Sequence, residues 1–141
     1  DADGSHDPGE APGLLEALQK FDIAIGSRSS EVGGGDERGP IRRMVSGGAK
    51  IILKMILGLR LGDPTSGYRA FRAAALKKIC EGGLQASGPE IVEEVYVRAG
   101  KLGLTMVEVP IVFKNRAGGE SKLTFVKLAR VFWSCIWMPK K

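Results

Sequence analysis

The sequence predicts a single α/β domain, in which helices with one apolar face pack against a small sheet. The chain alternates stretches of helical apolar periodicity with two short strand-like stretches, over residues 22–28 and 105–114. Its 141 residues suit one domain, and 43% hydrophobic with 26% charged residues is the composition of a globular chain.

The N-terminal part predicts a helix, a strand and a loop. The helix covers residues 8–20, and its apolar stripe consists of Leu14, Leu15 and Leu18. In the strand, Ile23 and Ile25 alternate with smaller residues, and Gly26 closes the apolar run. Residues 29–39 combine glycines with charges and lack periodicity, so a loop is expected there.

A basic amphipathic helix is predicted over residues 41–59, with Pro40 at its start. Apolar residues at helical spacing form one face, and Arg43, Lys50 and Lys54 gather on the opposite face. Such a helix suits a membrane surface or a partner protein. A solvated face on a core-packed helix explains these residues equally well.

The rest of the chain predicts a tight loop, two helices, a strand and a second amphipathic helix, over residues 61–71, 72–80, 88–103, 105–114 and 123–141. Gly103 ends the second of the two helices. Pro110 favours an edge position for the strand. Trp133 and Trp137 lie near lysines in the last helix, which suits a membrane interface and a core position nearly equally.

The composition of the chain limits which kinds of catalytic site and binding partner are expected. The two cysteines, Cys80 and Cys135, form neither a disulfide framework nor a metal-ligand pattern, and the single histidine, His6, leaves little room for histidine or zinc chemistry. A net charge of +5 favours an anionic partner such as a phospholipid surface or a phosphorylated substrate. We expect no nucleic-acid partner, because basic and aromatic residues do not interleave in the sequence.

Acidic residues stand out in two places. Asp1 and Asp3 have the i, i+2 spacing that can hold a divalent cation beside a substrate's phosphates, although Asp-x-Asp is also a frequent chance pattern. Glu90, Glu93 and Glu94 share one face of a predicted helix. We expect that face to be solvated, and the alternative is that at least one of its carboxylates points into an active-site cleft.

Basic residues beside predicted loops fit phosphate oxygens. Arg28 ends a strand, Arg42 lies at the start of the basic helix, and Arg116 and Lys122 flank a glycine-rich loop. The planar fork of arginine suits phosphate oxygens, and the start of a helix near Ser46 adds unpaired N–H groups. From charge alone these residues would be read as solvated surface cations.

Five blocks follow one another in a recognisable order: DADGSHDP, IGSR, RGPIRRMVSGGA, DPTSGYRAF and VPIVFKNRAGGESKL. In this order they resemble the dolichol-phosphate (polyprenol-phosphate) mannose synthases, and TSGYR and RAGGESKL are the most specific blocks. The resemblance covers residues 1–125 and implies part of a GT-A, Rossmann-like glycosyltransferase domain. Residues 126–141 would then form a membrane-interface helix.

The resemblance also implies a catalytic site. Asp1 and Asp3 match the residues that bind Mg²⁺ or Mn²⁺ on the donor diphosphate, and Ser5 stands where a third ligand is often glutamine. The residues that match the acceptor-phosphate site are Arg28, Arg42, Ser46, Arg116 and Lys122. The residues expected to shape the sugar pocket are Asp63, Ser66 and Tyr68. Asp63, which precedes Pro64, is equally explained as a turn residue.

The implied reaction transfers mannose from GDP-mannose to a polyprenyl (dolichyl) monophosphate with inversion, at the cytoplasmic face of a membrane. The acceptor phosphate is itself the nucleophile, so no strong protein base is required. Two alternatives stay open: a polyprenyl-phosphate glucosyltransferase that uses UDP-glucose, and a catalytically silent fragment that binds membranes.

The first residues of the chain imply a truncation. In the family that the sequence resembles, Asp-x-Asp ends a central strand, and the half of the domain that binds the nucleotide precedes it. We therefore expect this chain to be the C-terminal part of a catalytic domain, with little or no activity alone. Pairing with the missing N-terminal half or with a second copy would cover the exposed sheet.

Overall fold

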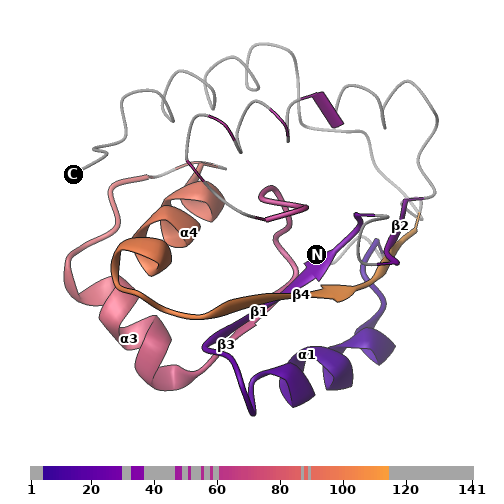
Figure 1. Ribbon diagram of the computed structural model, residues 1–141, viewed down its shortest axis with the longest axis horizontal. Helices are drawn as coiled ribbons and strands as arrows, with labels where there is room; N and C mark the ends of the chain where they lie inside the picture. The colour runs from indigo at the N-terminus through magenta and orange to yellow at the C-terminus, as the bar shows by residue number, and fades with distance from the viewer. Residues whose placement is uncertain are drawn as a thin grey trace.

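The computed structural model describes residues 5–29, 33–36, 47–48, 51, 55, 58, 61–86, 88 and 90–114. This part of the chain is mixed α and β, in agreement with the predicted class (Figure 1). Its elements in chain order are η1 (Pro8–Glu10), α1 (Ala11–Ala17), β1 (Ile23–Ser27), β2 (Gly35–Asp36), β3 (Arg69–Phe71), α3 (Ala73–Glu81), α4 (Ile91–Lys101), β4 (Met106–Pro110) and β5 (Val112–Phe113).

The main sheet has the strand order β3-β1-β4. β1 is parallel to β4, with Ile23 opposite Met106 and Ser27 opposite Pro110, and antiparallel to β3, with Ile23 opposite Phe71. β4 is an end strand of the described sheet, as Pro110 predicted. Because of these directions, the carboxyl ends of β1 and β4 and the loop before β3 meet at one edge of the sheet.

Ile111 links this sheet to a second one, in which β2 and β5 are parallel. Its N–H donates to the Ser27 carbonyl at 3.0 Å, and its carbonyl accepts from the Gly35 N–H at 2.9 Å. The prediction of one continuous strand over 105–114 is therefore wrong, because the chain changes sheets at Ile111. The loop expected over 29–39 contains the short strand β2.

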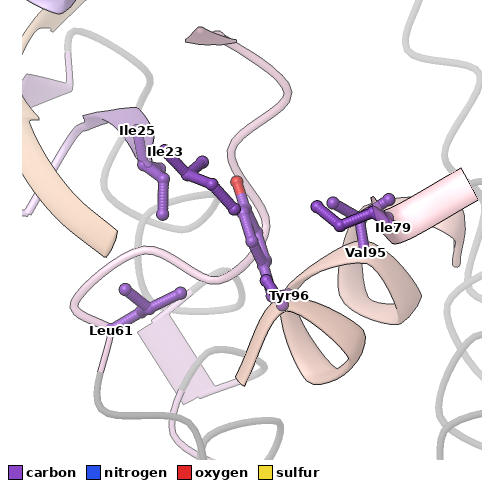
Figure 2. Packing of buried hydrophobic residues seen from close by; sticks show 7 residues of the cluster. Ile23, Ile25, Leu61, Ile79, Val95 and Tyr96 are labelled. Carbon is purple, nitrogen blue, oxygen red and sulfur yellow. The ribbon is translucent and has the colours of Figure 1, made fainter. Parts of the chain in front are cut away.

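The hydrophobic core lies between the sheet and the helices α3 and α4. It consists of Ile23, Ile25, Leu61, Ile79, Val95, Tyr96 and Ala99. Figure 2 shows the Tyr96 ring extending from α4 between Leu61 on one side and Val95 on the other. The Tyr96 hydroxyl donates to the Ser66 carbonyl at 2.8 Å, so the only polar atom of this side chain has a partner in the core.

The two helices α3 and α4 confirm the predictions over 72–80 and 88–103. Gly103 follows α4 with a φ of 67°, a conformation that glycine adopts without strain, and it ends the helix as predicted. Glu93 and Glu94 lie in the first turn of α4 and Arg98 in the last, an order that complements the helix dipole.

Two local predictions are confirmed only in part. The helix expected over 8–20 is divided into η1 and the short α1, which lies on the other side of the sheet from α4 (Figure 1). Leu14 is buried whereas Leu15 is 61% exposed, because α1 presents only a narrow face to the sheet. The loop expected over 61–71 ends in β3, since its last residues pair with β1.

Candidate active site

A guanidinium–carboxylate pair lies at the edge where β1 ends. Arg28 follows β1 directly, and its Nε donates to Oδ2 of Asp63 at 2.6 Å while its Nη2 donates to Oδ1 at 2.8 Å. Nη2 also donates to Thr65 Oγ1 at 2.8 Å, and the Arg28 backbone N–H donates to Asp63 Oδ2 at 3.2 Å. Two parallel bonds of this kind fix the plane of a guanidinium group.

The pair is almost completely buried. The Asp63 side chain is 0% exposed and that of Arg28 is 10% exposed. The guanidinium carbon of Arg28 lies 5.2 Å from the centre of the Phe113 ring, close enough for a cation–π contact. Asp63 also accepts from the Ser66 N–H at 3.3 Å through its carbonyl, so the residue forms a turn and binds Arg28 at the same time.

A second carboxylate supports the same loop from β4. Glu108 Oε2 accepts from the Gly62 N–H at 2.6 Å, and its Oε1 accepts from the Asp63 N–H at 2.8 Å. Glu108 belongs to no motif that pointed to the site in the sequence. One feature of the sequence could have indicated it: Glu108 is the one charged residue in the strand sequence MVEVP. A carboxylate among apolar strand residues needs a specific hydrogen-bond partner.

The residues that follow the Asp-x-Asp motif lie close to the pair. The centre of the His6 ring lies 4.9 Å from that of Tyr68 and 5.0 Å from that of Phe113. The Tyr68 hydroxyl donates to the Asp7 carbonyl at 3.0 Å. Phe113 therefore contacts both His6 and Arg28, and it links the N-terminal segment to the guanidinium.

Three further predicted site residues, Ser5, Ser66 and Tyr68, form hydrogen bonds with backbone groups near the same edge of the sheet. Ser5 is buried, and its carbonyl accepts from the Lys114 N–H at 3.0 Å. Ser66 is buried, and its Oγ donates to the Gly26 carbonyl at 2.5 Å. Burial raises the pKa of the Tyr68 phenol above its ordinary value, and nearby carboxylates add to this effect.

The other predicted site residues lie outside the described part of the chain, namely Asp1, Asp3, Arg42, Ser46, Arg116 and Lys122. The predicted interface helix over 126–141 also lies outside it. Within the described residues, no group of three or more His, Cys, Asp or Glu side chains could hold a metal ion. None of the helices in this part has the length and apolar character to cross a membrane.

The acidic face of α4 differs from the prediction. Glu93 is only 4% exposed, and its Oε2 has no hydrogen-bond partner among the described residues. Burial raises the pKa of Glu93 to about 7, against the effect of the Arg69 guanidinium. Glu94 accepts from the N–H groups of Gln85 and Ala86. The expectation that this face is solvated is therefore wrong, because α4 turns it toward the core and the preceding loop.

Known proteins align with most of this chain. The chain is 40% identical over 124 residues to the undecaprenyl-phosphate mannosyltransferase of Micrococcus luteus, covering 88% of the chain and 51% of that protein. It is 42% identical over 127 residues to the polyprenol monophosphomannose synthase of Mycolicibacterium smegmatis, covering 88% and 47%. It is 42% identical over 130 residues to the dolichol-phosphate mannosyltransferase of Pyrococcus furiosus, covering 87% and 34%.

The chain spans about half the length of the first two relatives and a third of the last. No family model matches the chain. The resemblance inferred from the five sequence blocks is nevertheless confirmed: over 87–88% of its length the chain is homologous to part of the polyprenyl- and dolichol-phosphate mannosyltransferases.

Proposed function

We propose that the protein is a glycosyltransferase that transfers mannose from GDP-mannose to a polyprenyl monophosphate, with a GT-A catalytic domain. The names of the three relatives support a mannosyl product and a polyprenyl or dolichyl phosphate acceptor. The observation in the chain itself is Arg28, whose guanidinium is held in one orientation by Asp63 and Thr65 at the carboxyl ends of two parallel strands.

In this proposal Arg28 binds the acceptor phosphate and orients it as the nucleophile. A phosphate oxygen forms a bond to C1 of mannose, the bond from C1 to the donor diphosphate breaks, and GDP leaves with that electron pair. Attack from the face opposite the leaving group inverts C1. A fixed, almost buried guanidinium favours this step because it brings one anion to a defined place without reorganising.

The N-terminal carboxylates would hold the cation of this reaction. Asp1, Asp3 and Ser5 supply carboxylate and hydroxyl oxygens, the donor type that Mg²⁺ and Mn²⁺ prefer. When bound, such a cation neutralises charge that develops on the departing diphosphate. The contacts of His6 with Phe113 support this assignment, because they bring the segment just after the motif beside Arg28.

The acceptor is proposed to reach the site from a membrane surface. Ile51 and Met55 have helical backbone conformation, and their side chains are 60% and 72% exposed. Residues four apart on a helix share a face. Exposed apolar residues on one face of the basic helix predicted over 41–59 support contact with a bilayer.

A donor comparison tests the proposal. The full product of the gene is incubated with a short polyprenyl phosphate, Mn²⁺ and either radiolabelled GDP-mannose or radiolabelled UDP-glucose, and label is counted in the organic phase. We expect label from GDP-mannose only, and NMR of the product should show an inverted anomeric carbon. Label from UDP-glucose alone, or membrane binding without label from either donor, would overturn the proposed function.

A further inference from the structure

A carboxylate on β4 binds the loop that carries Asp63, the partner of Arg28. Glu108 lies at the middle of β4, opposite Ile25 of the central strand β1. Each of its two oxygens accepts a backbone N–H, from Gly62 at 2.6 Å and from Asp63 at 2.8 Å. The Glu108 carboxylate lies close to Gly62: a Cβ on that residue would be 3.0 and 3.1 Å from the two carboxylate oxygens.

These two hydrogen bonds position the backbone of Asp63, from which its side chain extends toward Arg28. Two consecutive backbone N–H groups bound to one carboxylate constrain the two peptide planes on either side of Gly62. The Asp63 carboxylate then binds Nε and Nη2 of Arg28. A continuous set of hydrogen bonds therefore runs from the rigid central sheet, through the loop, to the guanidinium.

We propose that Glu108 is a positioning residue, which sets the orientation of Arg28 toward the acceptor phosphate without touching the substrate. The proposal rests on the proposed function, in which Arg28 binds that phosphate. A loop shift of about 1 Å suffices to lower the efficiency of a positioned group by one to two orders of magnitude. The effect of losing Glu108 should thus appear in acceptor binding, and not in donor binding.

The chain offers a matched control for a purely structural role. Glu94 of α4 makes the same kind of clamp, because its carboxylate accepts from the Gln85 N–H at 2.9 Å and from the Ala86 N–H at 2.7 Å. Those residues belong to the loop between α3 and α4, whereas the side-chain hydrogen bonds of Arg28 described above go to Asp63 and Thr65. Glu94→Gln therefore removes an equivalent pair of hydrogen bonds from a loop other than the one that carries Asp63.

The test measures both KM values and the melting temperature in the full product of the gene. We expect Glu108→Gln to raise the KM for a polyprenyl phosphate about tenfold and to change the KM for GDP-mannose less than about twofold. Glu94→Gln should lower the melting temperature to a similar degree and leave the acceptor KM within about twofold. Equal effects of the two variants on the acceptor KM would overturn the proposal.

A double-mutant cycle shows whether Glu108 acts through Arg28. In an Arg28→Lys background, Glu108→Gln should add less than about a twofold further rise in the acceptor KM, whereas independent residues would multiply their effects. If Glu108→Gln does not fold, Gly62→Ala crowds the same carboxylate and replaces it in the cycle. An unchanged acceptor KM in Arg28→Lys itself contradicts the proposed function, and a changed one with additive effects contradicts only the role of Glu108.

Discussion

The carboxylate of Asp63 binds the guanidinium of Arg28 through two parallel hydrogen bonds of 2.6 and 2.8 Å, although the two residues lie 35 positions apart in the chain. Both side chains are almost excluded from solvent. Removing one partner of such a pair leaves the other charge buried without compensation. The pair thus joins the stability of the fold to the placement of the proposed phosphate-binding group.

Asp63→Asn should destabilise the protein strongly. The substitution keeps the shape of the side chain but removes the charge that compensates Arg28, so we expect the free energy of unfolding to fall by roughly 3–5 kcal/mol. Urea denaturation measures this loss. Asp7→Asn is the control, because Asp7 pairs with Lys114 at the surface, and its loss should be much smaller. Similar losses for both variants would contradict the buried character of the Arg28–Asp63 pair.

Glu93 should make stability depend on pH. In the folded protein its pKa is raised from 4.5 to about 7, mainly by burial. The folded state therefore keeps a proton between these two values that the unfolded chain releases, and stability falls as the pH rises from 4.5 to about 7. At about 1.4 kcal/mol for each pH unit, the loss is roughly 3 kcal/mol.

Glu93→Gln should abolish this part of the pH dependence, because a neutral amide has no proton to release. Urea midpoints at pH 5 and pH 8 compare the two proteins. We expect the variant to gain stability relative to the original protein at the higher pH. A difference between the two proteins that stays constant over this range would show that Glu93 does not titrate there.

Gly34→Ala should disturb the junction between the two sheets. A Cβ on Gly34 would overlap the Ser27 carbonyl oxygen, which accepts from the Ile111 N–H. Because backbone must move to make room, we expect a loss of about 1–3 kcal/mol in unfolding free energy. Gly100→Ala is the control: its Cβ meets nothing within 4 Å, and alanine is favoured inside α4. An unchanged free energy of unfolding in Gly34→Ala would contradict the close approach of Gly34 to the Ser27 carbonyl.

Much of the fold was predictable because local sequence determines it. The periodicity of residues 72–80 predicted α3, and Gly103 marked the end of α4. β3 was missed because its three residues carry no alternation of their own and become a strand only by pairing with β1. Leu15 fits the apolar stripe in sequence, but which face of α1 the sheet covers is decided by tertiary packing.

The candidate site was predictable only in part, for the same physical reason. Arg28 and Asp63 were each singled out from their motifs, but no local signal pairs residues that far apart in the chain. Glu108 was missed because it binds backbone N–H groups. Every residue except proline carries such a group, so the sequence does not indicate which of them a carboxylate binds. Burial of Glu93 depends on the packing of α4, which helical spacing alone does not determine.

The most direct test of the central claim is the acceptor dependence of mannosyl transfer by Arg28→Lys, compared with Arg72→Lys. Arg72 also makes two hydrogen bonds through its guanidinium, to the carbonyls of Leu18 and Gln19, but it follows β3 at the opposite end of the sheet. We predict that Arg28→Lys raises the acceptor KM about 10- to 100-fold, since lysine cannot keep the charge-assisted, bidentate geometry. Arg72→Lys should leave it within about twofold. An acceptor KM unchanged in Arg28→Lys would contradict the assignment of Arg28 to the acceptor phosphate.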